Sequence, residues 1–120
     1  AAEYGSARGL YELANLYSKG EGVAKDYSKA IEYYKLGVNK GSHLAMHGLG
    51  RMYELGLGIP PDLINAAKLY EQALAINPND YNAAYWLASM YFNGLGVDKN
   101  ITLACHILPH FHSSFRMATQ

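Results

Sequence analysis

An eleven-residue pattern occurs three times in this chain: LANLYSKGEGV at residues 13–23, LGRMYELGLGI at 49–59 and LASMYFNGLGV at 87–97. The second copy follows the first after 36 residues, and the third follows the second after 38. The two additional residues lie between repeats, around Asn77 and Pro78. Self-similarity at a period of roughly 20–50 residues is the signature of a repeat protein. The pattern therefore predicts stacked copies of one small structural unit.

Each unit is predicted to contain two helices joined by a tight reversal. In the first unit, Leu13 and Tyr17 belong to an apolar stripe at helical spacing. Gly20 and Gly22 end that helix, because glycine reaches left-handed backbone angles that other residues avoid. Asp26 is positioned to cap the following helix through its carboxylate.

The second helix of the first unit carries its own apolar stripe, in which the small Ala30 lets the hairpin partner approach closely. Ala66 and Ala104 occupy the same register in the later units. We therefore expect an all-α fold of about three antiparallel hairpins without strands, close to the minimum number for a stable stack. The expected helices are 6–19, 26–39, 42–55, 61–76, 80–93 and 100–108.

The full pattern is Gly-x3-(Ala/Gly)-x3-Leu-(Gly/Ala)-x2-Tyr-x2-Gly-x-Gly-Val, followed by Asp-x3-Ala-x3-Tyr. It resembles the Sel-1-like repeat family, whose members are relatives of the tetratricopeptide repeat. The resemblance covers residues 1–108 and implies a right-handed α-α superhelix with units at 5–40, 41–78 and 79–108. It also implies an adaptor or scaffold role in protein complexes.

The chain departs from the family pattern at its end. Leu108 replaces the expected Tyr, and Pro109 cannot donate a helical hydrogen bond. Residues 109–120 match no repeat and are expected to form a terminal cap or a loosely ordered tail. Near the start, residues 1–5 align with 37–41, the last turn of a second helix. We therefore expect the chain to be part of a longer repeat array.

Composition narrows the classes of partner. The chain has 120 residues, of which 50% are hydrophobic and 17% charged, as in a globular domain. Its net charge is zero, without the basic stripe that binds phosphates, so no nucleic-acid partner is expected. No apolar run approaches the roughly 20 residues of a membrane span.

The histidines, the single cysteine and the glycine loops are the candidates for catalytic or metal sites. His106, His110 and His112 invite a metal hypothesis, but Pro109 interrupts their helix and no carboxylate is near in sequence. Cys105 stands where the second unit has Ala67, so a small packed residue is favoured over a nucleophile. The Gly-x-Gly loops lack the third glycine and the strand of a dinucleotide site. We therefore predict no metal site, no cofactor and no enzymatic activity.

Binding residues are expected where the repeats differ, because the repeated positions are used for packing. In this superfamily the first helix of each hairpin lines the concave face. The predicted binding residues for a partner protein or peptide are Arg8, Tyr11, Asn15, His47, Arg51, Glu54, Tyr85, Ser89 and Phe92. An ordinary solvated face is the simpler interpretation. The alternative function is a hydrolase acting on a cell-wall-like substrate, as proposed for some repeat relatives.

Overall fold

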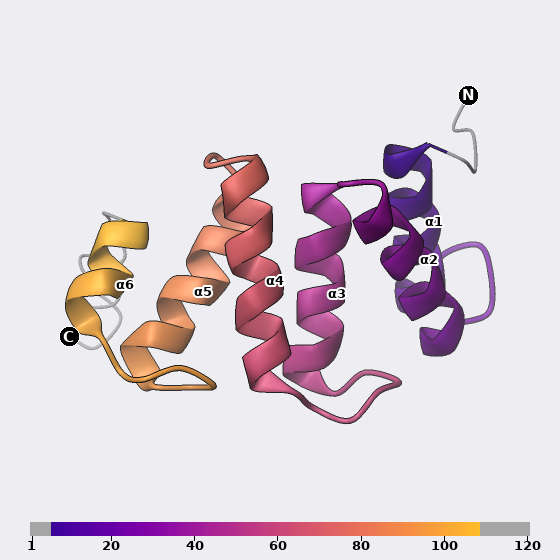
Figure 1. The fold of residues 1–120 in the computed structure, drawn as a ribbon. Coiled ribbons are helices and arrows are strands. Elements are labelled where there is room, and N and C mark those ends of the chain that lie inside the picture. The colour runs from indigo at the N-terminus through magenta and orange to yellow at the C-terminus, as the bar shows by residue number, and fades with distance from the viewer. Residues whose placement is uncertain (1–5, 109–120) are drawn as a thin grey trace.

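The computed structural model describes residues 6–108 and contains in that range six α-helices and no strand. The all-α prediction is confirmed, and every helix end lies within two residues of its expected position. The expected tail at 109–120 and the alignment of residues 1–5 lie outside the described residues. The helices are α1 (Ala7–Lys19), α2 (Tyr27–Asn39), α3 (His43–Leu55), α4 (Leu63–Ile76), α5 (Tyr81–Asn93) and α6 (Ile101–Ile107) (Figure 1).

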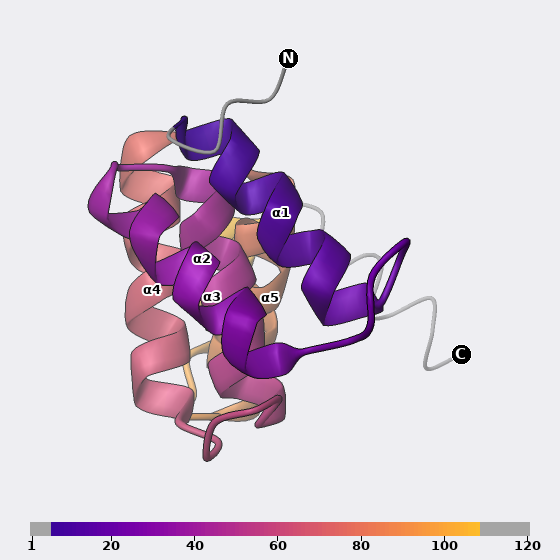
Figure 2. The ribbon, with the colours of Figure 1, turned by 90° about the vertical axis from the view of Figure 1, so that its right-hand side faces the viewer.

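The helices pair into three hairpins, α1 with α2, α3 with α4 and α5 with α6. Helix α3 also packs on α1 and α2, and α5 packs on α4, so the hairpins stack in chain order. Figure 1 shows this row from α1 on the right to α6 on the left. In the view of Figure 2, α4 lies on the left of the stack, whereas α1 and α5 lie on the right. The arrangement is a short helical solenoid.

A polar side chain caps the start of every described helix. The Asp26 carboxylate accepts a hydrogen bond from the backbone N–H of Lys29 at 3.1 Å, as the sequence predicted. Each cap accepts from the residue three positions along, which satisfies an N–H that the helix itself leaves unpaired. The capping residues are Ser6, Asp26, Ser42, Asp62, Asp80 and Asn100.

The loop inside each hairpin has the same geometry three times. Its first glycine, Gly20 in the first unit, adopts a left-handed conformation with φ 72° and ends the helix. The loop then closes with a backbone hydrogen bond from Asp26 N–H to the Tyr17 carbonyl at 2.9 Å. The equivalent bonds in the second and third units are 2.9 and 2.8 Å long. These loops are therefore structural turns, as predicted.

The second glycine of the loop is needed for contact between hairpins. A Cβ atom on Gly58 would lie 2.5 Å from the Cβ of Tyr27, at the start of α2. A Cβ on Gly96 would lie 2.6 Å from Leu63, at the start of α4. Each loop thus rests on the preceding hairpin, and only a glycine fits there. At Gly22 no atom of the described residues lies within 4 Å of the corresponding position.

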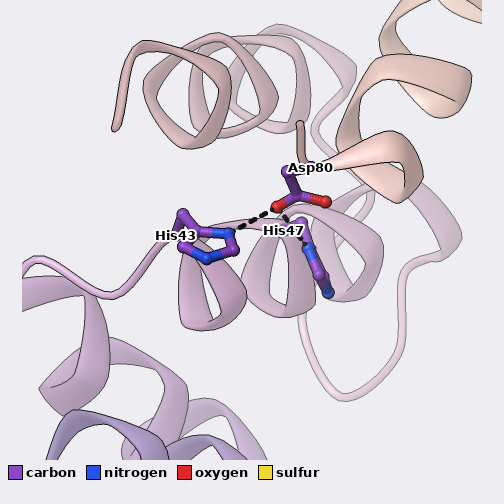
Figure 3. A group of neighbouring side chains, drawn as sticks. All are labelled: His43, His47 and Asp80. Carbon is purple, nitrogen blue, oxygen red and sulfur yellow. Dashed lines mark hydrogen bonds and ion pairs between the residues drawn. The ribbon is translucent and has the colours of Figure 1, made fainter. Parts of the chain in front are cut away.

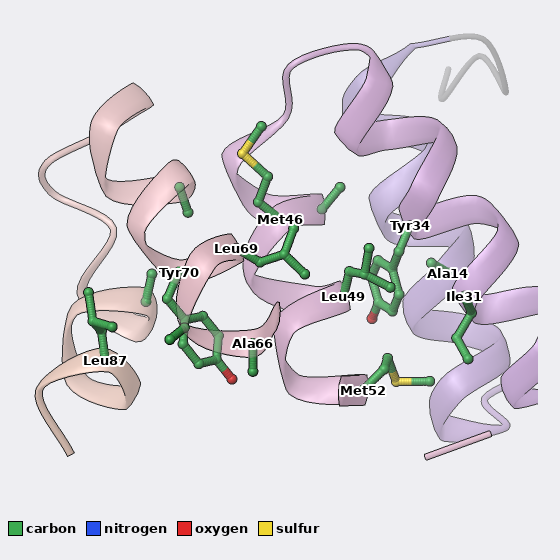
Figure 4. Packing of buried hydrophobic residues seen from close by; sticks show 14 of the residues in the cluster. Ala14, Ile31, Tyr34, Met46, Leu49, Met52, Ala66, Leu69, Tyr70 and Leu87 are labelled. Carbon is green, nitrogen blue, oxygen red and sulfur yellow. The ribbon is translucent and has the colours of Figure 1, made fainter. Parts of the chain in front are cut away.

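Small residues and tyrosines pack among the leucines, isoleucine and methionines of the core. Ala30, Ala66 and Ala104 have no exposed surface, which confirms the close approach predicted for them. The rings of Tyr34 and Tyr70 are buried on opposite sides of α3 (Figure 4). A Cβ on Gly48 would meet the Tyr34 ring at 2.4 Å, and one on Gly50 would meet the Tyr70 ring at 2.6 Å. The glycines of α3 therefore make room for these rings.

The tyrosines of the repeated motif lie at the seams, as expected from their identity in all three units. Tyr17, Tyr53 and Tyr91 are half-buried against the core. The Tyr17 ring stacks on Tyr33 of α2 with centroids 5.8 Å apart.

Cys105 on α6 is half-buried. Among the described helices, none combines the length and apolar character needed to cross a membrane.

Candidate functional site

A groove of about 440 Å³ runs across the first helices of the three hairpins. We call it the central groove. Residues of α1, α3 and α5 form most of its wall, and Tyr34 of α2 and Leu57 of the α3–α4 loop complete it. The full lining is Tyr11, Asn15, Ser18, Lys19, Tyr34, His47, Gly48, Arg51, Met52, Leu57, Asn82 and Trp86.

Arg51 and Trp86 form the most distinctive contact of the groove. The guanidinium carbon of Arg51 lies 4.5 Å from the centre of the Trp86 ring, a cation–π distance. Arg51 Nη1 also donates to Glu54 Oε1 at 3.1 Å, and the Tyr70 hydroxyl donates to that same oxygen at 2.6 Å. Because the guanidinium is held on two sides, its remaining N–H groups point from a fixed position.

The Tyr70 hydroxyl helps to hold Glu54, and through it Arg51, in place. Burial raises the pKa of Tyr70, and its hydrogen bond to the negative Glu54 carboxylate raises that pKa further. The phenol therefore stays neutral and keeps donating to Glu54 at any ordinary pH. Glu54 in turn stays available to orient Arg51.

The rest of the wall is aromatic and hydrogen-bonded. The His47 ring meets Tyr11 edge-on with centroids 5.7 Å apart, and it meets Trp86 at 5.5 Å. The Tyr34 hydroxyl donates to the Asn15 side-chain oxygen, and burial raises the pKa of Tyr34. These contacts fix the side chains that line the groove before any ligand arrives.

The charge of the groove is positive. Lys19 and Arg51 both contribute to its lining, and within the described part of the chain no carboxylate does. Glu54 neutralises part of the Arg51 charge from the side. The arrangement favours a ligand with an acidic group or several carbonyl oxygens.

Four of the predicted binding residues line the central groove: Tyr11, Asn15, His47 and Arg51. Glu54 lies outside the lining but holds Arg51 in place. These four side chains are the part of the predicted binding face that coincides with the groove, and their role in binding stays a prediction.

The other predicted residues lie elsewhere. Arg8 is exposed and donates to Glu12 at 3.0 Å, one turn along α1. Tyr85, with 51% of its surface exposed, does not line the groove, and neither does Ser89. Phe92 packs against the buried cluster of Ala88 and Ala104. On α5 the groove is instead lined by the turn that carries Trp86.

Sequence reasoning missed Trp86, Asn82 and Lys19 as lining residues. Trp86 carried a usable signal, because it is the only tryptophan of the chain and aligns with Glu12 and Gly48. It is thus a large side chain at a position that does not repeat. Lys19 and Asn82 also stand at positions that do not repeat, because they align with Leu55 and Asn93 and with Leu44 and Arg8. Only the stacking of the hairpins decides which of these varying positions face the groove.

A second cluster lies at the side of the groove, where His43 and His47 of α3 meet Asp80 at the start of α5 (Figure 3). The Nδ1 atoms of His43 and His47 lie 2.9 and 2.8 Å from the same oxygen, Oδ2 of Asp80. The other oxygen, Oδ1, accepts from the backbone N–H of Ala83 at 3.1 Å. Asn77 lies 3.2 Å from His43 Nε2.

Asp80 is buried, with a side chain only 3% exposed, and it keeps its negative charge. Burial alone would raise its pKa, but hydrogen bonds from His43, His47 and the Ala83 backbone together hold the pKa below its ordinary value of 3.8. The carboxylate thus links the second hairpin to the third.

From the sequence, a metal site is considered only at His106, His110 and His112, and none is predicted there. His110 and His112 lie outside the described residues, and His106 is exposed on α6. His43 and His47 are four residues apart on one helix, a spacing that was visible in the sequence. Only the stacking of the hairpins brings Asp80, more than thirty residues away, to both rings.

Comparison with known proteins agrees with the fold. A family profile described as Sel1 repeat matches residues 7–42, 43–76 and 82–108. The chain is 37% identical over 113 residues to "ERAD-associated E3 ubiquitin-protein ligase component HRD3B" of Arabidopsis thaliana, covering 93% of this chain and 19% of that protein. It is also 37% identical over 80 residues to human "Protein sel-1 homolog 2", covering 66% of this chain and 12% of that protein. The chain thus spans less than a fifth of these relatives.

Two solved structures share the architecture. A Sel1 repeat protein from Oxalobacter formigenes superposes with a TM-score of 0.74 at 29% identity, covering 94% of this chain and 84% of that one. A protective antigen of uropathogenic Escherichia coli with an SLR fold superposes with a TM-score of 0.82 at 24% identity, covering 92% of this chain and 23% of that one. With three matched repeats across most of its length, the chain belongs to the Sel1 repeat family.

Proposed function

We propose that this chain is a protein-binding segment that holds a peptide or helix of a partner in the central groove. The observation that supports this most directly is the Arg51–Trp86 pair, a cation held at 4.5 Å over an aromatic ring on the wall of an open groove. Tryptophan, tyrosine and arginine are the side chains that contribute most to binding energy in protein interfaces.

The groove chemistry defines the partner. Arg51 and Lys19 offer hydrogen-bond donors to an acidic side chain or a backbone carbonyl. Trp86 and Tyr11 offer apolar surface beside those donors. The preferred segment therefore carries a carboxylate next to an apolar or aromatic residue. Because hydrogen bonds already fix the lining side chains, little entropy is lost when the segment binds.

The relatives support the same role at a coarser level. Two plant relatives and one yeast relative are named as components of an ERAD-associated E3 ubiquitin-protein ligase. A component of a multiprotein ligase has to contact other subunits. We propose an adaptor or scaffold role for this chain, in which the repeat stack supplies surface and no chemistry.

The hydrolase alternative would need a nucleophile hydrogen-bonded to a base. Ser18 lines the groove together with His47, but its hydroxyl donates to the Asn15 carbonyl at 3.1 Å. The Nδ1 of His47 is bonded to Asp80. Within residues 6–108 no hydrogen bond joins Ser18 to His47, so this geometry favours binding over catalysis.

We propose that a further repeat precedes the first hairpin of the stack. Gly58 and Gly96 each rest on the start of the preceding hairpin's second helix. Gly22 has the same left-handed backbone, with φ 77°, but no described atom lies near it. A preceding repeat would place its second helix against Gly22. This supports the expectation of a longer repeat array.

The test begins with a ligand selected from a random peptide library on the purified chain. Calorimetry with that peptide is then repeated for Trp86→Ala and Arg51→Ala, with folding checked by circular dichroism. Each substitution should weaken binding by about 1–3 kcal/mol. Glu32→Ala, an exposed change on α2, serves as the control and should leave affinity unchanged. Equal affinity for all variants would place the binding surface outside the central groove.

A further inference from the structure

We propose that His43, His47 and Asp80 form a binding site for a divalent transition metal ion such as Zn²⁺, with the two Nδ1 atoms and Oδ2 as ligands. The three ligand atoms lie within 4.8 Å of one another. Two imidazoles and one carboxylate are a ligand set that zinc accepts, usually with water as the fourth ligand.

To hold an ion, the three ligand atoms have to reach tetrahedral spacing. Metal–ligand bonds of about 2.0–2.2 Å in a tetrahedron separate neighbouring ligand atoms by roughly 3.3 Å. The two Nδ1–Oδ2 distances are 2.9 and 2.8 Å, so they have to widen by about half an ångström as the ion replaces the two Nδ1 protons. Each neutral imidazole then carries its one proton on Nε2 in place of Nδ1, by exchange through solvent, so no net proton is released and the carboxylate stays charged.

Two of the three ligands are already held in place. Asp80 caps α5 through Oδ1, so Oδ2, which faces both histidine rings, can bind the ion as a single oxygen ligand. The His47 ring is fixed between Tyr11 and Trp86. A site whose supporting contacts are preformed binds an ion with less loss of entropy.

His43, the third ligand, can shift to accommodate the ion and leaves a path for the ion to enter. His43 is the first residue of α3, and its side chain is 25% exposed. Figure 3 shows its ring approaching Asp80 from the side opposite to the start of α5. Its exposed side allows an ion to enter and a water to complete the coordination.

Asn77 influences how readily the His43 proton moves from Nδ1 to Nε2 when an ion binds. Its amide nitrogen lies 3.2 Å from His43 Nε2, an arrangement that keeps the His43 proton on Nδ1. When the ion takes Nδ1, the proton has to sit on Nε2, which then needs an acceptor. A carboxylate at position 77 would provide one and raise the basicity of the ligand.

The site would have a structural consequence for the groove. His47 belongs both to the metal cluster and to the groove lining, and Asp80 begins the helix that carries Trp86. A bound ion would therefore tie α3 to α5 beside the Arg51–Trp86 pair. This inference stands apart from the proposed function, because it is tested with the ion alone and needs no peptide.

The decisive experiment is a titration of the purified, metal-free chain with Zn²⁺ alone, against a competing chromogenic chelator, together with melting curves. We expect one ion per chain and a rise in melting temperature. His43→Ala should weaken zinc binding by at least about tenfold. Asn77→Asp should strengthen it, since Asp keeps the oxygen that accepts from Asn79.

The remaining histidines supply the matched control. The triple variant His106→Ala, His110→Ala, His112→Ala leaves the proposed ligands intact and should bind zinc within about twofold of the unmodified chain, a difference below 0.5 kcal/mol. Asp80→Asn keeps an oxygen for the helix cap but removes the charged ligand, so it should also lose zinc. Co²⁺ in place of Zn²⁺ should show the strong visible absorption of a four-coordinate ion.

Three outcomes would contradict the proposal. If no stoichiometric zinc binding is found, the cluster is a hydrogen-bond network only. If His43→Ala binds zinc as the unmodified chain does and the triple variant does not, the ion belongs to the C-terminal histidines. Weaker binding by Asn77→Asp would contradict Nδ1 as the ligand atom of His43.

Discussion

The guanidinium of Arg51 on α3 stacks 4.5 Å from the ring centre of Trp86 on α5, and so joins the second hairpin to the third across the central groove. Trp86 is the only tryptophan of the chain, which makes its fluorescence a specific reporter of this contact. A cation over the indole ring and a neighbouring imidazole both influence its emission.

We therefore expect Arg51→Ala to change the emission of Trp86 in the free protein, because the ring loses its covering cation. A peptide bound in the groove should change that emission further in the unmodified chain. Steady-state fluorescence measures both effects. Glu32→Ala, an exposed change on α2 outside the groove lining, should leave the spectrum as it is. A saturating peptide that left Trp86 emission unaltered would argue for binding elsewhere.

The second glycine of each loop should tolerate substitution differently in different units. Gly22→Ala and Gly58→Ala share the same backbone penalty, about 1–2 kcal/mol, because both glycines have φ near +75°. Only Gly58→Ala also drives a Cβ into Tyr27, at 2.5 Å. Gly58→Ala should therefore be more destabilising, by roughly a further 1–3 kcal/mol. Urea unfolding of the two variants measures the difference, and equal losses would contradict the contact.

The hairpin seam should resist larger side chains. Ala66 on α4 has no exposed surface, so Ala66→Leu has to displace its neighbours and should lower the free energy of unfolding by roughly 1–3 kcal/mol. Ala75 lies on the same helix but is exposed, and Ala75→Leu is the matched control with little expected effect. Thermal melts of both variants test this. An unchanged melting temperature for Ala66→Leu would mean that the seam is not tightly packed.

Asp80 should make stability depend on acid pH. Its pKa in the folded chain is held below the ordinary value of 3.8, so its contribution is present above that value. As pH falls through the folded-state pKa, the carboxylate takes up a proton and the contribution is lost. Asp80→Asn should cost about 1–3 kcal/mol near neutral pH and progressively less in acid.

The matched control is Asp62→Asn, because Asp62 also caps a helix but bonds to no histidine within residues 6–108. Asp62→Asn should lower the free energy of unfolding only slightly, and this loss should not show the pH dependence expected for Asp80→Asn. Unfolding free energies of both variants, measured in metal-free buffer from pH 7 down to pH 2, compare the two carboxylates. A cost for Asp80→Asn that did not change with pH would show that its charge adds nothing to stability.

The sequence alone determined the helices, the loops and the class of fold. Periodic leucines and tyrosines, the capping residue Asp26 and the left-handed Gly20 act within a few residues of chain, so their effect can be read from spacing. The repeat added the stacking, because an apolar face that recurs every 36 to 38 residues has to be covered by its neighbour. Four groove residues on α1 and α3 were among the predicted ones, because they stand at positions of the first helices that differ from repeat to repeat.

The tertiary structure alone decided which side chains from different hairpins meet. The turn of α5 that faces the groove carries Trp86 and not Tyr85, a difference of one position that shifts a side chain by about 100° around a helix. Asp80 reads in the sequence as a helix cap, yet the stacking of α5 on its neighbours also places its second oxygen between His43 and His47. Helical periodicity fixes directions within one helix, whereas such contacts depend on how two hairpins are rotated and packed against each other.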